Sequence, residues 1–126
     1  MINIPVSLGE VIDKLSILSI KKIEIKNKKK LIDINKEYDL LLIIYNKFLN
    51  KELAKLYNEI YIINYKLWKI EDDIRDKERN KEFDEIFIEL ARSVYITNDE
   101  RMNIKNIINQ NSNSDIKEHK SYKPYI

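Results

Sequence analysis

Charged and aromatic side chains interrupt an otherwise regular hydrophobic pattern near the N-terminus, in the middle of the chain and in its last third. The residues that stand out are Asp13, Lys14, Trp68, Glu71, Arg75, Arg92, Asn98, Asp99 and Arg101. Arginine and lysine bind phosphate and carboxylate groups, and an indole ring offers a flat face for stacking. These residues are therefore candidates for binding an anionic small molecule.

The spacing of hydrophobic residues predicts that four helices carry these side chains. Apolar residues recur every three or four positions in four segments: 8–25, 31–48, 53–74 and 83–108. The third segment is an unbroken heptad seam, which is typical of a helix packed against another helix. The sequence has one glycine and two prolines, too few for the tight turns of a β-sandwich or barrel.

Polar residues indicate where these helices begin. Ser7 and Glu10 match a capping box, and Asn50 and Asn80 are predicted to cap the third and fourth helices. A second capping-box pattern at residues 97–100 predicts that the fourth helix kinks or restarts there. The inward-facing side of the fourth helix is predicted to carry Phe83, Phe87, Leu90 and Val94.

The predicted fold is all-α: an antiparallel helical bundle, or paired helical hairpins, of four helices with long third and fourth helices. Residues 1–110 are expected to form this bundle. Residues 111–126 are expected to form a short irregular C-terminal tail, which either docks on the bundle through Tyr122 and Tyr125 or extends into solvent. Long helices in so small a domain also favour a homodimer that shares its core between chains.

An up-down-up-down bundle would bring the polar candidates together. In that arrangement the first and third connections lie at the same end of the bundle. Counting residues from that end puts Lys14, Trp68 and Arg92 within about one turn of the same level. The resulting polar layer is either an ion-pair network that fixes helix register, a site for an anionic small molecule, or a surface for a protein partner.

The anion-site interpretation gives each candidate a role. Arg75 and Arg101 would bind the anion, and Trp68 would stack on the ligand. Glu71 or Asp99 would orient the arginines.

Charge is also distributed unevenly along the chain, although the overall net charge is only +2. Residues 21–30 contain six lysines and one glutamate, a net charge of +5. Residues 71–89 contain nine carboxylates and four basic residues, a net charge of −5. In an up-down bundle these two regions could lie side by side and fix the order of the helices. The alternative is two separate solvated surfaces.

Several classes of chemistry find no support. The chain has no cysteine and one histidine, His119, and its only glycine cannot form a phosphate loop. We therefore expect no catalytic residue, metal or cofactor. Without a signal peptide or a long apolar run, a cytoplasmic location with no membrane partner is expected. The lysine cluster raises the question of nucleic acid, but no recognition-helix signature accompanies it, so nucleic acid is not an expected partner.

Four stretches carry a resemblance to a known family: residues 6–18 (VSLGEVIDKLSIL), 67–75 (LWKIEDDIR), 87–101 (FIELARSVYITNDER) and 118–122 (EHKSY). They resemble a family of small helical proteins of unknown function from bacteria and their phages. The resemblance implies an all-helical fold and no assigned activity, and some relatives accompany enzymes of surface-glycan biosynthesis. The positions that match the family's polar pattern are Asp13, Lys14, Trp68, Glu71, Asp72, Arg75, Arg92, Asn98, Asp99 and Arg101.

Two functions remain open from the sequence. The leading interpretation is a non-enzymatic helical association module, which self-associates and could serve an enzyme as its protein partner. The alternative is a protein that binds an anionic small molecule, such as a sugar phosphate or nucleotide sugar, in the polar layer between its helices.

Overall fold

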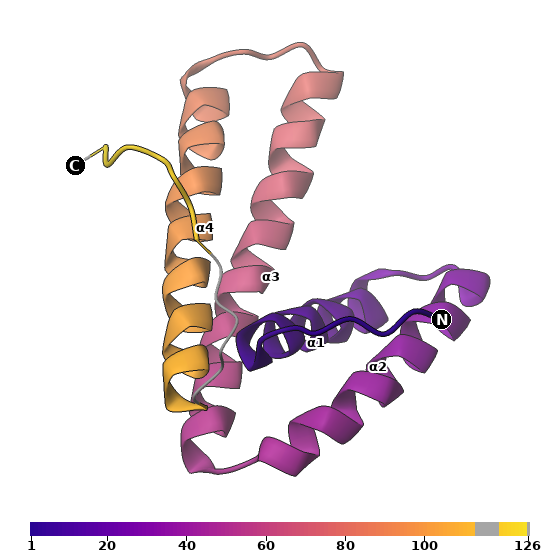
Figure 1. Cartoon of the computed structure of the whole chain (residues 1–126). Helices are drawn as coiled ribbons and strands as arrows, with labels where there is room; N and C mark the ends of the chain where they lie inside the picture. The colour runs from indigo at the N-terminus through magenta and orange to yellow at the C-terminus, as the bar shows by residue number, and fades with distance from the viewer. Residues whose placement is uncertain (113–118, 126) are drawn as a thin grey trace.

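The computed structural model describes residues 1–112 and 119–125, and these residues form four helices and no strand (Figure 1). The helices are α1 (Leu8–Glu24), α2 (Lys28–Phe48), α3 (Lys51–Arg79) and α4 (Glu85–Asn111). The predicted all-α class is therefore confirmed, with α3 and α4 the longest helices at 29 and 27 residues. Within the described residues, no helix is long and apolar enough to cross a membrane.

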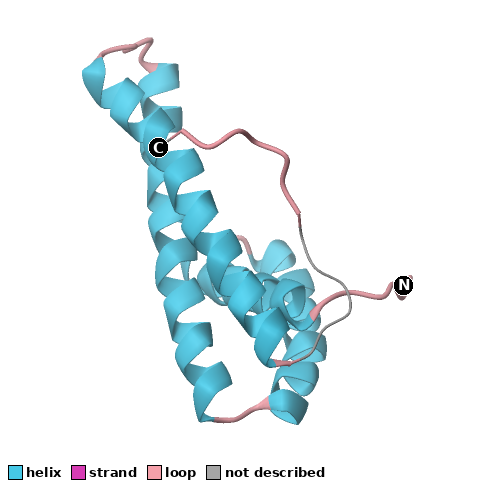
Figure 2. Cartoon of the chain, turned by 60° about the vertical axis from the view of Figure 1, so that its left-hand side comes forward, coloured by secondary structure: helices cyan, strands magenta, loops and turns pink. Residues whose placement is uncertain are grey.

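The helices are arranged as two paired hairpins rather than as four parallel rods. α3 and α4 lie side by side, and the α1–α2 hairpin projects from their lower half (Figure 1). Figure 2 shows the same arrangement from a second side. α1 joins the two hairpins because it packs against α2, α3 and α4. α2 packs along α1 and meets α3 where the rings of Tyr45 and Tyr57 lie 5.3 Å apart.

The hydrophobic core lies where the first half of α1 meets the lower parts of α3 and α4. Its buried residues are Leu8, Ile12, Leu53, Leu56, Ile60, Ile104 and Ile108. The helical spacing of these residues places them on one face of each helix, as the sequence pattern predicts. The outer halves of α3 and α4 lie beyond this core, so only two helices cover one another there (Figure 1).

Gly9 allows α1 to approach α4 closely. A Cβ atom at this position would lie 2.6 Å from the carbonyl oxygen of Lys105 and 2.7 Å from Oδ1 of Asn109. The backbone N–H of Gly9 donates to the same Asn109 oxygen at 2.7 Å. The only glycine of the chain therefore serves helix packing.

The predicted starts of the first and third helices are observed. The Ser7 hydroxyl accepts from the backbone N–H of Glu10, and Asn50 caps α3 in the same way. Asn27, which was not predicted as a cap, caps α2. The Ser7–Glu10 capping box is only half formed, since the Glu10 carboxylate forms an ion pair with Lys105 at 2.8 Å instead.

The start of α4 differs from the prediction. Asn80 ends α3, and its backbone N–H donates to the carbonyl of Asp76. Lys81 follows with a positive φ of 56°, which turns the chain away from the helix. The N-cap of α4 is Asp84, whose carboxylate accepts from the backbone N–H of Phe87 at 3.0 Å. Phe83 lies before this cap and is exposed, so its predicted inward orientation is wrong.

The predicted kink at residues 97–100 is absent, and α4 is continuous through them. Thr97 is fully buried. Asn98 accepts from Arg101, and Asp99 accepts from Tyr125. Asn98 therefore bonds within α4, Asp99 bonds to the C-terminal segment, and neither side chain caps a new helix.

The described part of the C-terminal segment, residues 119–125, contacts α4. The Tyr125 hydroxyl donates to Oδ2 of Asp99 at 2.8 Å. The ring of Tyr125 also meets the ring of Tyr95 edge to face, with centroids 5.2 Å apart. Residues 113–118 and 126 of the predicted tail lie outside the described residues.

Candidate functional site

Asp13 is the centre of a polar cluster that joins α1 to α3 and α4. Its side chain is 1% exposed, and Arg101 donates to both carboxylate oxygens, with Nε 2.8 Å from Oδ1. Asn64 on α3 donates from Nδ2 to the same Oδ1, also at 2.8 Å. A buried carboxylate is costly unless it is paired and hydrogen-bonded. These bonds therefore explain how the core tolerates Asp13.

Lys105 brings a second cation to the cluster. Its side chain is buried, and Nζ lies 2.8 Å from Glu10 and 3.8 Å from Asp13. Because Arg101 and Lys105 are four residues apart, they face α1 from consecutive turns of α4. Two cations from α4 thus oppose two carboxylates from α1, which leaves the contact close to neutral.

Sequence reasoning missed Asn64, Ser16 and Lys105 as members of this cluster. Asn64 donates to Oγ of Ser16 at 2.7 Å, and that hydroxyl donates in turn to the backbone carbonyl of Asp13. The position of Asn64 in the helical repeat of α3 could have revealed its burial. Asn64 is four residues after the core residue Ile60, so it lies on the buried face of α3 despite being polar.

A pocket of about 200 Å³ opens beside the cluster. It lies between α1, α4 and the C-terminal segment, and its lining residues are Glu10, Asn98, Arg101, Met102, Lys105 and Lys120. A larger pocket of about 600 Å³ adjoins it and shares Asn98, Met102 and Lys120. Tyr95 and Tyr125 line this second pocket, so a polar hollow continues into an aromatic one.

The hydrogen bond between Tyr125 and Asp99 forms one wall of the larger pocket. The hydrogen bond to Asp99 raises the pKa of the Tyr125 hydroxyl above its ordinary value. The reason is that the bond requires the protonated phenol as its donor. Burial of the phenol acts in the same direction. The contact is therefore present at neutral pH.

The structure brings together only part of the predicted polar layer. Arg101 contacts both Asp13 and Asn98, since its Nε lies 2.8 Å from Oδ1 of Asp13 and its Nη1 lies 3.5 Å from Oδ1 of Asn98. Asp99, the residue after Asn98 on α4, bonds to Tyr125 of the C-terminal segment.

The other candidates lie outside the cluster. Lys14 forms an exposed ion pair at 3.0 Å with Glu37 on α2. Glu71 and Arg75 pair with each other at 3.3 Å, one turn apart on the exposed surface of α3. Such exposed pairs contribute little to stability.

Trp68 and Arg92 are not among the residues that the described contacts join to Asp13. Trp68 is half-buried on α3, one turn beyond Asn64 towards the α3–α4 connection, and Arg92 is exposed on α4. The predicted levels assumed that the α1–α2 and α3–α4 connections lie at the same end. Figures 1 and 2 show these connections apart, with α1 crossing α3 and α4. Asp13 therefore meets α3 near the predicted level, at Asn64, but meets α4 at Arg101, well beyond Arg92.

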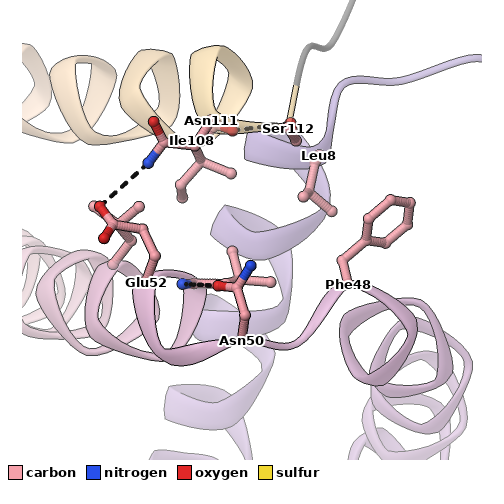
Figure 3. Close-up of a pocket in the computed structure, with 9 residues that line it drawn as sticks. Leu8, Phe48, Asn50, Glu52, Ile108, Asn111 and Ser112 are labelled. Carbon is pink, nitrogen blue, oxygen red and sulfur yellow. Dashed lines mark hydrogen bonds between the residues drawn. The ribbon is translucent and has the colours of Figure 1, made fainter.

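A third pocket, of about 150 Å³, lies where the end of α2 meets the ends of the other helices. Figure 3 shows Leu8, Phe48 and Ile108 around it. Its amides are already engaged, because Asn50 caps α3 and Asn111 donates to Glu52 at 3.3 Å. This pocket therefore offers an apolar surface and few groups for recognising a charged ligand.

Within the described residues, no group of three or more histidine, aspartate or glutamate side chains is placed to hold a metal ion. No curated protein and no solved structure is significantly similar to the chain. A family of unknown function (DUF6165) matches residues 2–126. Since the match extends over the helices, the Asp13 cluster and the C-terminal segment, the chain belongs to the DUF6165 family.

Proposed function

We propose that this chain is a non-enzymatic helical association module, whose outward faces are covered by another protein chain. The observation that carries the proposal is α2, which is 21 residues long and contains no buried residue. Helices in proteins draw most of their stability from burying an apolar face. α1 packs along α2, whereas α3 meets it near Tyr45. A further chain on the open side of α2 would supply the missing contacts.

The open side of α2 carries large apolar side chains. Ile32 is 68% exposed and Ile43 is 57% exposed. These two residues are separated by three helical turns, so they lie on the same side of α2. Leu40 and Phe48 are also exposed. Apolar side chains gathered on one element are typical of a protein interface.

The test is the association state of the purified chain across a range of concentrations. Sedimentation velocity is expected to show a species of at least twice the chain mass. Replacing Ile32 and Ile43 together by serine is expected to weaken this association at least about tenfold, because the substitution removes apolar area from the contact. The matched control replaces Asn35 and Lys36, exposed neighbours on α2, by serine. A strictly monomeric parent protein, at all concentrations and with no exposed apolar surface detected by a dye, would contradict the proposal.

A second candidate function is the binding of an anionic small molecule, favoured by the two adjoining pockets beside α4. Arg101, Lys105 and Lys120 line the polar pocket, and tyrosines line the larger one. A sugar phosphate or nucleotide sugar would place its phosphate near the cations and its ring against the tyrosines. In this pocket Lys105 and Lys120, with Arg101, would bind the anion in place of Arg75, and tyrosines would stack on the ligand in place of Trp68.

A thermal-shift titration tests this second function with inorganic phosphate, a sugar phosphate and a nucleotide sugar as probes. A ligand that binds the folded state raises Tm in a concentration-dependent manner. The rise is expected to disappear in Lys120→Ala and to persist in Lys51→Ala, a distant exposed lysine on α3. If no probe raises Tm, or if both variants respond equally, ligand binding in this pocket is excluded.

A further inference from the structure

The two most strongly charged regions of the chain lie apart in the folded protein. We call residues 21–30, around the α1–α2 connection, the basic corner. We call residues 71–89, around the α3–α4 connection, the acidic tip. Their net charges are +5 and −5, and Figures 1 and 2 show the two connections well separated. Among the described residues, no ion pair joins the two regions.

Each region contains charges that the chain itself does not pair. In the acidic tip, Lys77 pairs with Glu82 and Asp84, and Arg79 pairs with Asp76. Within the described part of the chain, no ion pair involves Asp72, Asp73, Glu85 or Glu89 of the tip, or Lys28, Lys29 or Lys30 of the corner. Both regions therefore present uncompensated charge of opposite sign.

Each region also contains large exposed apolar side chains. Phe83, Ile86 and Ile88 of the acidic tip are all more than half exposed. Ile23 in the basic corner and Ile32 just after it are exposed to a similar degree. Solvated charge alone does not indicate an interface, but apolar groups surrounded by complementary charge do.

We infer that two copies of this chain associate about a two-fold axis, with the basic corner of each protomer against the acidic tip of its partner. This arrangement rests on the proposed association function and names its partner. A second copy supplies a complementary surface of equal and opposite net charge. Because a two-fold axis repeats every contact, a single complex satisfies both corners and both tips. The sideways projection of the α1–α2 hairpin leaves the corner accessible to a second molecule (Figure 1).

The experiment uses two charge-reversal variants of the full chain. The first carries Lys28→Glu, Lys29→Glu and Lys30→Glu, and the second carries Asp72→Lys, Asp73→Lys and Glu89→Lys. Every contact in a dimer of either variant alone would oppose like charges, so its Kd is expected to rise at least about tenfold. In a mixture of the two variants every contact regains opposite charges, and a heterodimer is expected. The matched control carries Lys51→Glu, Lys55→Glu and Lys66→Glu on the exposed surface of α3, and is expected to associate like the parent protein.

Circular dichroism verifies that each variant is folded, and the salt dependence of the parent dimer gives a second measurement without substitutions. Sodium chloride is expected to raise its Kd, because salt screens exposed charges. If the parent dimerises but neither single variant weakens it, or if the mixture forms no heterodimer, this arrangement is wrong while self-association stands. If the parent does not self-associate, the arrangement and the self-association on which it rests both fail.

Discussion

Arg101 on α4 holds Asp13 on α1 with two hydrogen bonds, one to each carboxylate oxygen, across a separation of 88 residues in the sequence. Asn64 on α3 donates to the same carboxylate, so one buried acid connects three of the four helices. A contact of this kind specifies which faces of the helices meet, since an apolar core alone would tolerate several registers.

Removing one member of this contact is expected to be strongly destabilising. Asp13→Ala leaves Arg101 without its buried partner, and breaking a buried ion pair in this way costs about 3–5 kcal/mol of unfolding free energy. Glu71→Ala, which breaks the exposed pair with Arg75, is the control and is expected to cost about 0.5 kcal/mol or less. Urea denaturation measures both values. Similar losses for the two variants would show that the Asp13 cluster adds no stability.

Gly9→Ala tests the close approach of α1 to α4, and the sign of the effect is diagnostic. Helix propensity alone predicts that alanine stabilises α1 by up to about 1 kcal/mol. The clash with the carbonyl of Lys105 instead predicts a loss of about 1–3 kcal/mol. Asn58→Ala, on the exposed side of α3, is the control, where propensity should dominate. Thermal unfolding distinguishes the two outcomes, and a raised Tm for Gly9→Ala would contradict the observed packing.

Acid is expected to weaken the start of α4. The pKa of Asp84 lies below its ordinary value, because its carboxylate accepts from the backbone N–H of Phe87 and from Lys77. A lowered pKa in the folded state means that the charged form stabilises the fold. This contribution is present above the ordinary pKa and is lost as pH falls through the lowered one.

Asp84→Asn should therefore lose less stability than the parent protein as pH falls from about 6 to about 2. The control is Asp72→Asn, at an exposed carboxylate of α3 for which the described residues provide no ion pair. Tm measured across this pH range gives the comparison. Parallel curves for the parent and Asp84→Asn would exclude this role of Asp84.

Tyr125→Phe is expected to loosen the C-terminal segment from α4, because it removes the hydrogen bond to Asp99. Trypsin cleavage after Lys120 should then become several-fold faster, since cleavage follows the population of the released segment. Tyr122→Phe is the control, because the Tyr122 side chain is largely exposed. Mass spectrometry of timed digests follows the cleavage. Equal rates for the two variants would indicate that the Tyr125 contact does not hold the segment.

The same contact should respond to alkaline pH. The pKa of Tyr125 is raised in the folded protein by the hydrogen bond to Asp99. The stability that this hydrogen bond contributes is therefore complete below the ordinary pKa of tyrosine and is lost as pH rises through the raised pKa. Cleavage of the parent protein after Lys120 should accelerate above about pH 10, whereas Tyr125→Phe should show no such acceleration. The rate at which trypsin cleaves an unstructured peptide at each pH corrects for the pH dependence of trypsin itself.

The fold class and the starts of α1 and α3 could be predicted because they depend on local physics. Ser7 and Asn50 bond to backbone groups three residues away, and a heptad seam needs only its own helix to be recognised. Asn80 was misassigned because Asp84 offers α4 a stronger cap, which also pairs with Lys77. That choice depends on how the whole connection folds.

The candidate site could be predicted only in part, since it depends on the angle between the hairpins. Asp13 and Arg101 stood out as charged residues within apolar stripes, and the structure joins them. Lys105 and Asn64 lie in the same polar stripes but were not among the candidates, because their burial follows from the crossing of α1 over α3 and α4. No residue spacing within one helix encodes that crossing, so the sequence could not show that Arg75 pairs with Glu71 on the exposed surface instead of joining Asp13.

The bonds from Gly9 to Asn109 and from Asp13 to Arg101 also constrain how the chain is made. They span 100 and 88 residues, so α1 leaves the ribosome long before its partners on α4 exist. Until α4 emerges, Asp13 lacks the cations of α4, and Leu8 and Ile12 lack the Ile104 and Ile108 side of their core. Contacts this distant in sequence close slowly. Apolar surface left uncovered during this interval favours aggregation of the newly synthesised chain.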